Sequence, residues 1–511
     1  MPRRGPLRPR RIRVGTCWKR SPHASTGCLV SLGRRAVRGV AATAGGQWAR
    51  FVIHIGSTMI LARLVTPEDY GLVTMIVAIT GLIERLLTVG LRTATIQRRE
   101  LNNAQVSALF WITISLGTLA TGVFALSAQF IAGFYGQDEL VPVALAMSSV
   151  FLLSTAGTQH VALLERELRF SLLAVMEIAA IAVAAVVAVI AAMLGLGYWA
   201  IVFLHVVQPA VRGCFGWFGT GWVPALPRDR NDLGELLSFG AYQTFFQVLV
   251  YLSQNVDNVL IGREVGAASL GVYSRAYALL LMPIRQLQAP LHRVAIPTLS
   301  RLQDQPERFR QFYRTGLSAT AHTAIPLILV MAVAADDVIW VALGDQWTEA
   351  GPIFRVLAFA GLATVIGHAN GWLYVSLGRV RRQAVWGLIV HPILIGSFFL
   401  GLPGGALGVA TAYTIARWVT LPASLAMATH GTPVAFADAI RSVWRPAVVA
   451  SVAYAGAWAV REGGVGWPVF GSLAATGLAF GVVYMGVLVS WPAARSEFKQ
   501  LVGLVRGGFR S

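Results

Sequence analysis

The sequence predicts an all-α protein that crosses a membrane about 14 times, and three observations support this class. Of the 511 residues, 56% are hydrophobic and only 13% are charged, whereas a soluble domain is about 45–50% apolar and about 25% charged. Apolar runs of about 20 residues, the length that spans a bilayer, recur along the chain. No stretch between these runs is long enough for a soluble domain of useful size.

The apolar runs locate the expected spans. Several of them are separated only by short turns such as Thr66-Pro67-Glu68-Asp69. The runs are 46–65, 70–91, 106–132, 141–164, 172–194, 198–222, 236–261, 269–298, 316–342, 352–377, 384–401, 405–428, 443–460 and 467–490.

The distribution of basic residues predicts the orientation. Of the 42 Lys and Arg residues, 30 lie in the first 45 residues, in the even-numbered loops and after Pro492, and only Arg263 and Arg461 lie in odd-numbered loops. Basic residues in short loops stay on the cytoplasmic side. We therefore expect a multi-pass protein of the cytoplasmic (inner) membrane with both termini inside. Because the net charge of +19 is mostly of this topological kind, no nucleic-acid partner is expected.

Ten arginines remain inside the spans or at their edges, where each costs at least about 2.5–3.5 kcal/mol near the bilayer centre. Snorkelling at a helix end accounts for some of them, but Arg285 lies in the middle of a span. Several such residues suggest a water-filled, cationic interior. The ten are Arg50, Arg63, Arg85, Arg212, Arg275, Arg285, Arg293, Arg355, Arg417 and Arg445.

A shift of 200 positions superimposes the first and seventh spans and brings Gly71 onto Gly271. Because seven is odd, the two halves are predicted to be parallel repeats about an axis along the membrane normal. Polar side chains form a stripe on one face of each of these spans, and we expect the stripes to line a cavity. Helix-to-helix hydrogen bonding by the same side chains is the alternative. The stripes comprise Gln47, His54 and Thr58 in the first span and Gln243, Gln247, Gln254 and Asn258 in the seventh.

Four stretches together resemble the bacterial polysaccharide exporter and flippase family of the Wzx type, and most of all its colanic-acid and teichuronic-acid exporters. They are Arg63 to Leu72, Asn255 to Arg263, Leu270 to Tyr277 and Ala295 to Gln303. The resemblance covers roughly residues 31–430. It implies the multidrug/oligosaccharidyl-lipid/polysaccharide exporter fold, with two six-helix lobes around a central cavity and often two further C-terminal helices.

The resemblance and the duplication together suggest a division of the chain into six parts. We expect a basic disordered tail (1–29), an N-terminal six-helix lobe (30–223), a cytoplasmic linker (224–235), a C-terminal six-helix lobe (236–430), two additional transmembrane helices (431–492) and a basic cytoplasmic tail (493–511).

In this family the substrate is an oligosaccharide linked to undecaprenyl pyrophosphate. The resemblance thus implies a lipid-linked oligosaccharide and membrane lipids as partners, with a polysaccharide polymerase and glycosyltransferases as further candidates. The planar guanidinium of arginine binds phosphate through two hydrogen bonds. We expect substrate binding, in falling order, by Arg50, Arg285, Arg275, Arg85 and Arg355. For each of them a structural ion pair or a snorkelling side chain is the alternative.

Related carriers use an ion gradient and alternating access, and Asp257 is the candidate for ion coupling. It is a carboxylate on a polar helix between Asn255 and Asn258, where partial burial would favour the protonated form. A salt bridge to Arg263 or Arg275 is the competing interpretation.

The first 29 residues are rich in Arg and Pro and lack the apolar core of a secretory signal. We hypothesise that translation begins at Val30, which would lower the net charge. Intact-mass analysis of the natively expressed protein would refute this by detecting residues 1–29. A basic anchor for anionic lipid heads is the alternative.

Two other classes of function fit the sequence less well. A multidrug or cation exporter of the same fold would favour an acidic and aromatic interior. A membrane-embedded polysaccharide polymerase or glycosyltransferase needs a catalytic group on a sizeable loop, and no catalytic motif is present. Nine scattered histidines and three cysteines suggest neither a catalytic nor a metal site. We therefore expect a transporter, without a cofactor, and not an enzyme.

Overall fold

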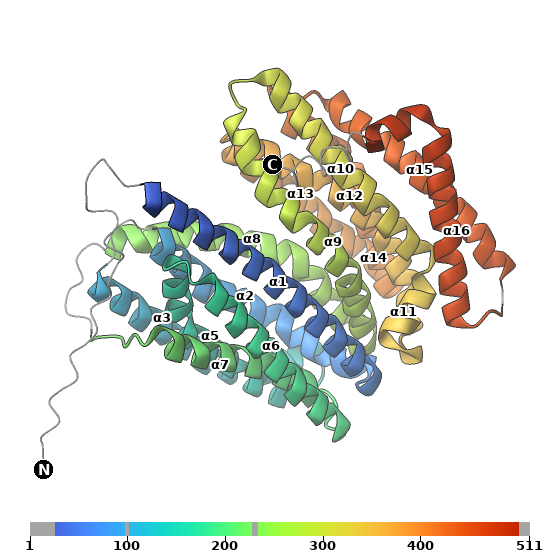
Figure 1. Cartoon of the computed structure of the whole chain (residues 1–511). Coiled ribbons are helices and arrows are strands. Elements are labelled where there is room, and N and C mark those ends of the chain that lie inside the picture. Colours follow the sequence, from blue (N-terminus) through green and yellow to red (C-terminus); the bar gives the residue numbers. More distant parts are fainter. Residues whose placement is uncertain (1–25, 98–101, 227–232, 465, 500–511) are drawn as a thin grey trace, which may run out of the picture. The chain divides into compact units, whose positions relative to one another are not determined.

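A computed structural model describes residues 26–97, 102–226, 233–464 and 466–499, and these residues form helices without any strand. Figure 1 shows the helices in chain order. They are α1 (Thr26–Leu64), α2 (Pro67–Gln97), α3 (Asn103–Leu126), α4 (Ala128–Tyr135), α5 (Leu140–Arg166), α6 (Phe170–Met193), α7 (Trp199–Thr220), α8 (Leu233–Glu264), α9 (Ala267–Arg301), α10 (Pro306–Val333), α11 (Ala335–Leu343), α12 (Ala350–Ser376), α13 (Val380–Gly401), α14 (Gly405–Thr429), α15 (Phe436–Gly463) and α16 (Val469–Ser490), with short 3₁₀ turns at Asp345–Trp347 and Leu402–Gly404.

Each expected span overlaps one long helix, but two of the spans continue into a second, shorter helix. The run 106–132 divides into α3 and α4 at Ser127, whose hydroxyl donates to the Val123 carbonyl, and the run 316–342 divides into α10 and α11 at Ala334. Among the described residues, ten stretches are long and apolar enough to cross a membrane by length and composition. The protein is therefore multi-pass, and the count of 14 spans stays a prediction.

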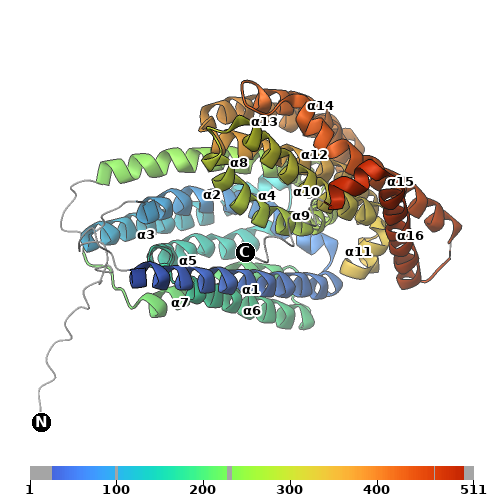
Figure 2. The ribbon, with the colours of Figure 1, turned by 45° about the horizontal axis from the view of Figure 1, so that its top comes forward.

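The described residues form two compact units, and the first takes its residues from Met1–Val65 and Ile76–Leu252. Within it α6 packs against α1 and α7, and α5 packs against α3 and α7, as Figures 1 and 2 show. Val106, Phe110, Leu163 and Trp222 form a core that joins α3, α5 and the segment after α7. The Trp111 indole also donates to the Ala225 carbonyl at 3.0 Å. The linker expected at 224–235 is thus anchored at its start. Residues 227–232 of the linker, residues 1–25 of the N-terminal tail and residues 500–511 of the C-terminal tail lie outside the described residues.

The second unit comprises Thr66–Met75 and Ser253–Ser511, and residues 500–511 within it are not described. Here α12 packs against α9, α10 and α14, α13 pairs with α14, and α15 contacts α10 and α16. Because Thr66–Met75 includes the first turns of α2, a short piece of the N-terminal sequence belongs to this unit. The lobes expected at 30–223 and 236–430 stay a prediction.

Two glycines allow the first turn of α2 to pack directly on the first turn of α9 in the second unit. A Cβ on Gly71 would lie 1.8 Å from the Ala267 carbonyl oxygen, and a Cβ on Gly271 would lie 1.8 Å from the Pro67 carbonyl oxygen. Both neighbours are backbone atoms, which cannot turn aside as a side chain does. The pair superimposed by the 200-residue shift thus forms a reciprocal contact.

We expect Gly271→Ala to lower the thermal unfolding temperature of the purified protein by several degrees. The added methyl group would force the two helix ends apart, and overpacking of this kind costs about 1–3 kcal/mol or more. Gly396→Ala is the control, because a Cβ there meets nothing within 4 Å and alanine favours helix formation. Equal unfolding temperatures for the two variants would contradict the close contact.

Candidate functional site

Arg50, the arginine ranked first from the sequence, has an acidic partner in the first unit. Its Nη1 lies 3.3 Å from Oε2 of Glu177 on α6, and Nη1 of Arg212 on α7 lies 3.8 Å from Oε1 of the same residue. The Arg50 side chain is 36% exposed. Two guanidiniums share one carboxylate here, so the structural ion pair that was the alternative is present, and a role in substrate binding stays a prediction.

Arg355 also belongs to an ion-pair network, in the second unit. Its Nη2 donates to Oδ2 of Asp336 on α11 at 2.6 Å, and its guanidinium lies over the ring of Trp458 on α15. Arg461 on α15 donates to the same Asp336 oxygen at 2.8 Å. The absence of a side chain at Gly351 makes room for Asp336, because a Cβ at position 351 would lie 2.1 Å from Asp336 Oδ1. These contacts hold α15 against α11 and α12, which is a structural role.

Arg85 and Arg275 each lie over a tyrosine ring. In the first unit the Arg85 guanidinium carbon is 4.2 Å from the centre of the Tyr251 ring, and the adjacent Glu84 accepts a hydrogen bond from Ser154 instead of pairing with Arg85. In the second unit the Arg275 carbon is 4.8 Å from the centre of the Tyr70 ring. The Nε of Arg275 is buried without a hydrogen-bond partner. Neither arginine forms an ion pair with a described residue.

Arg285 belongs to a group of basic side chains inside the second unit, called here the basic cluster: Arg285 and His292 on α9, His368 on α12 and Arg417 on α14. The guanidiniums of Arg285 and Arg417 act electrostatically on His368, and the ring of His292 lies next to it. Arg417 donates from Nη2 to Thr364 Oγ1 at 2.8 Å, and its buried Nε has no partner. Within the described ranges neither arginine forms an ion pair, so this cluster has the free positive charge that an anion needs.

The two histidines of the basic cluster face a small space between α9, α10 and α12. Their ring centres are 6.0 Å apart and the rings are nearly perpendicular. The Trp372 indole donates to His292 Nδ1 at 3.2 Å, and the amide nitrogen of Gln288 lies 3.1 Å from His368 Nδ1. The space is lined by Gln288, Leu291, His292, Thr320, Val365, His368, Ala369 and Trp372. Two of the nine histidines thus line one space, a proximity that the sequence did not suggest.

The expected polar stripes lie on α1 and α8. Gln47, Gln247 and Asn258 are half-buried, while His54 and Gln254 are exposed. Asn258 donates from Nδ2 to the side-chain oxygen of Asn255 at 3.4 Å. The side chain of Gln243 lies outside the described residues. A cavity shared by the two stripes stays a prediction.

Asp257 on α8 is buried, with 3% of its surface exposed. Its carboxylate accepts a hydrogen bond from the Tyr273 hydroxyl and another from the backbone N–H of Asn258, both at 2.8 Å. Arg263 contacts Glu264, and Arg275 lies over Tyr70. Asp257 has no ion pair with a described residue, so the competing salt bridge is not formed.

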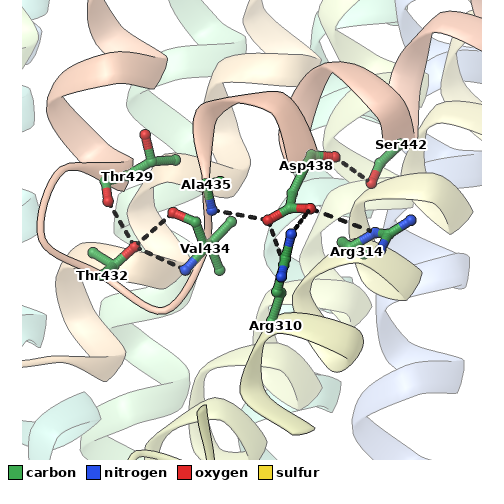
Figure 3. A network of polar contacts seen from close by, with 8 residues as sticks. All are labelled: Arg310, Arg314, Thr429, Thr432, Val434, Ala435, Asp438 and Ser442. Carbon is green, nitrogen blue, oxygen red and sulfur yellow. Dashed lines mark hydrogen bonds and ion pairs between the residues drawn. The ribbon is translucent and has the colours of Figure 1, made fainter. Parts of the chain in front are cut away.

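A second buried carboxylate, Asp438, has a structural role that the sequence did not suggest (Figure 3). It lies at the start of α15, before the expected span, and is 0% exposed. Arg310 on α10 donates to both of its carboxylate oxygens, at 2.6 and 2.9 Å, and the Ala435 N–H donates at 2.8 Å. Burial alone would raise the pKa of Asp438, but these hydrogen bonds and the charges of Arg310 and Arg314 outweigh it and lower the pKa.

We expect Asp438→Asn to lower the thermal unfolding temperature by several degrees, because it leaves Arg310 without its bidentate partner. A carboxyl whose folded pKa is lowered stabilises fully above its unfolded value of 3.8 and loses that contribution as the pH falls through the folded value. The difference in unfolding temperature between the variant and wild type should therefore be constant near neutral pH and should shrink in acid. Arg308→Ala, on the exposed side of α10, is the control and should unfold like wild type.

A family model described as "Polysaccharide biosynthesis protein" matches residues 60–352, more than half of the chain. The chain belongs to this family. It is similar to the teichuronic acid biosynthesis protein TuaB of Bacillus subtilis (strain 168), with 27% identity over 380 residues that cover 73% of this chain and 79% of TuaB. It is also similar to the lipopolysaccharide biosynthesis protein WzxC of Escherichia coli (strain K12), with 25% identity over 416 residues covering 79% and 84%.

The fold of this polysaccharide biosynthesis protein is found among solved structures. The lipid II flippase MurJ, in its inward closed conformation, matches with a TM-score of 0.68 and 13% identity, over 87% of this chain and 97% of MurJ. At this identity the match shows the fold alone. It agrees with an all-helical, multi-pass membrane protein, and the family match confirms the resemblance to Wzx-type proteins that the sequence suggested.

Proposed function

We propose that this polysaccharide biosynthesis protein is a flippase. It would move oligosaccharide repeat units linked to undecaprenyl pyrophosphate across the cytoplasmic membrane by alternating access, for the assembly of a surface polysaccharide. The observation that carries the proposal is the basic cluster, in which Arg285 and Arg417 have no acidic partner among the described residues. Family membership supports it.

The chemistry of such a substrate fits the cluster. The polyprenyl chain can stay in lipid, but a pyrophosphate and a hydrated glycan cannot cross hydrocarbon unaided. Guanidinium groups stay charged at any working pH and bind phosphate oxygens through paired hydrogen bonds. Arg285 is thus the proposed centre of the pyrophosphate site, with Arg417 added from the structure. Arg275 and Arg85, each over a tyrosine ring, follow, and Arg50 and Arg355 have less support because each forms an ion pair.

The finer architecture belongs to the same proposal. It comprises about 14 transmembrane helices, two six-helix lobes around a central cavity, two C-terminal helices and both termini in the cytoplasm of a bacterium. The excess of basic residues in the even-numbered loops supports this orientation. Asp257 is the proposed ion-coupling residue, because it is buried without a cationic partner among the described residues.

A multidrug or cation exporter of the same fold is the second candidate. Such a carrier needs a negatively charged site for its cargo, and Asp257 is the observation that favours it. The basic cluster argues against it, because two unpaired guanidiniums repel a cationic drug. A membrane-embedded polymerase or glycosyltransferase fits less well, and we propose that the protein is not an enzyme.

The deciding experiment is to delete the gene and to measure lipid-linked repeat units on the cytoplasmic side. A flippase predicts that these intermediates accumulate and that polymer disappears from the cell surface. A drug exporter predicts normal polymer and an increased sensitivity to cationic compounds. If polymer still reaches the surface and no intermediate builds up, the flippase proposal is wrong.

A further inference from the structure

The hydrogen bonds around the basic cluster fix the protonation of its first histidine. The indole nitrogen of Trp372 lies 3.2 Å from Nδ1 of His292. An indole N–H can only donate, so Nδ1 of His292 must accept. A histidine that accepts at one ring nitrogen is neutral and carries its hydrogen on the other. His292 is therefore neutral in this arrangement.

The second histidine has one ring nitrogen free to gain a proton. Nδ1 of His368 lies 2.8 Å from the backbone carbonyl oxygen of Thr364. A carbonyl can only accept, so this shorter contact places the hydrogen on Nδ1. The Gln288 side chain, 3.1 Å from the same atom, then faces it with its amide oxygen as a second acceptor, and Nε2 keeps its lone pair. His368 is exposed, and within the described part of the chain its Nε2 has no hydrogen-bond partner. Nε2 of His368 is thus an accessible base.

The groups that surround His368 are basic or neutral. The guanidiniums of Arg285 on α9 and Arg417 on α14 act on it electrostatically, and the neutral ring of His292 lies beside it. Thr320 of α10 lines the same space, Tyr313 of α10 contacts the ring of Trp372, and the Arg417 charge acts on His391 of α13. No carboxylate among the described residues acts on His368. Among the described residues, only cationic and neutral groups therefore act on His368.

We propose that His368 gains a proton when an anion enters the basic cluster, so that the anion and a proton are bound together. A negative charge placed among Arg285, Arg417 and His368 reverses the local potential and favours the imidazolium. Imidazole titrates near neutral pH, so a modest change in its surroundings is enough to change its charge. The imidazolium then donates from Nε2 to the anion as a third cationic group.

This inference rests on the proposed function for the identity of the anion, a pyrophosphate bonded to lipid on one side and to sugar on the other. Proton uptake and anion binding are linked and reciprocal. If binding takes up one proton, the affinity for an anion of fixed charge falls by up to about tenfold for each pH unit between the pH at which His368 titrates in the free protein and the higher pH at which it titrates with the anion bound.

The test uses the full-length protein in lipid nanodiscs and a short-chain polyprenyl pyrophosphate that carries one sugar. Each phosphate of this probe lacks the second acidic proton that titrates near pH 6 in a phosphate monoester, so the charge of the probe is constant between about pH 6 and about pH 8. Calorimetric titration in two buffers of different ionisation enthalpy gives the number of protons taken up. We expect the largest uptake, approaching one proton, near neutral pH, and weaker binding as the pH rises through this range.

His368→Gln should still bind the probe, but without proton uptake and with an affinity independent of pH. His322→Gln is the matched control, since His322 makes the same bond from Nδ1 to the carbonyl four residues earlier, at 2.9 Å, but lies apart from the basic cluster. It should behave like wild type. Binding by wild type without proton uptake, or uptake that persists in His368→Gln, overturns the inference and leaves the flippase proposal standing. Failure of wild type to bind the probe at all overturns the proposed function itself.

Discussion

Arg285→Ala is expected to reduce export of the lipid-linked oligosaccharide by roughly tenfold to a hundredfold, the equivalent of one or two lost hydrogen bonds to a charged group. Arg285 belongs to the second unit and its side chain is exposed. Its charge acts on His368, and it has no ion pair with a described residue. Its removal therefore breaks no contact that the fold needs. Insertion into the membrane and the thermal unfolding temperature should stay at the wild-type values.

Arg285→Lys should restore export only in part, because an ammonium group keeps the charge but lacks the planar fork that binds two phosphate oxygens. Arg293→Ala is the matched control, because Arg293 is also exposed and lies about two turns later on α9. Arg417→Ala should weaken export as well, and the double variant should export less than either single variant. Normal export by both Arg285→Ala and Arg285→Lys would refute the assignment of the pyrophosphate site. Export is measured as surface polymer in a deletion strain that carries each variant.

The fold was largely predictable because a bilayer imposes a simple rule on the sequence, a run of about 20 apolar residues for each crossing. Each expected span overlaps a long helix. The breaks at Ser127 and Ala334 could not be predicted, because the apolar run continues through both. The assignment of Thr66–Met75 to the second unit was also beyond the sequence, although the pair Gly71 and Gly271 was a usable signal.

The candidate site was less predictable, because the function of an arginine in a span depends on partners far away in the sequence. Arg50 meets Glu177, and Arg461 meets Asp336, over more than a hundred residues in each case. Periodicity within one helix cannot reveal such pairs. The sequence does not separate Arg417 from the other nine arginines in or near the spans. Only the structure shows that it forms no ion pair with a described residue. His292 and His368 are 80 residues from Trp372 and Gln288, respectively, and the same argument applies to them.

Asp257→Asn is expected to abolish gradient-driven flux while leaving the protein as stable as wild type or more stable. A buried carboxylate without a cationic partner costs folding free energy, and Asp257 has only the Tyr273 hydroxyl and the Asn258 N–H as described donors. Asparagine keeps the shape of the side chain: its amide oxygen can still accept from the Asn258 N–H, and its NH2 group can donate to the Tyr273 hydroxyl oxygen. It cannot gain or lose a charge, so coupling to a cation or a proton is lost.

Flux is measured in proteoliposomes with and without an imposed sodium or proton gradient, and the variant should transport at the rate seen without a gradient. Asp345→Asn is the matched control, because Asp345 accepts the same kind of bond from the following N–H, at 3.0 Å, but is exposed. A structural carboxylate would give the opposite pair of results, with lower stability and unchanged coupling. Loss of coupling together with unchanged or increased stability means that the buried carboxylate of Asp257 does not stabilise the fold. Its burial lowers the stability of the protein and is needed for transport.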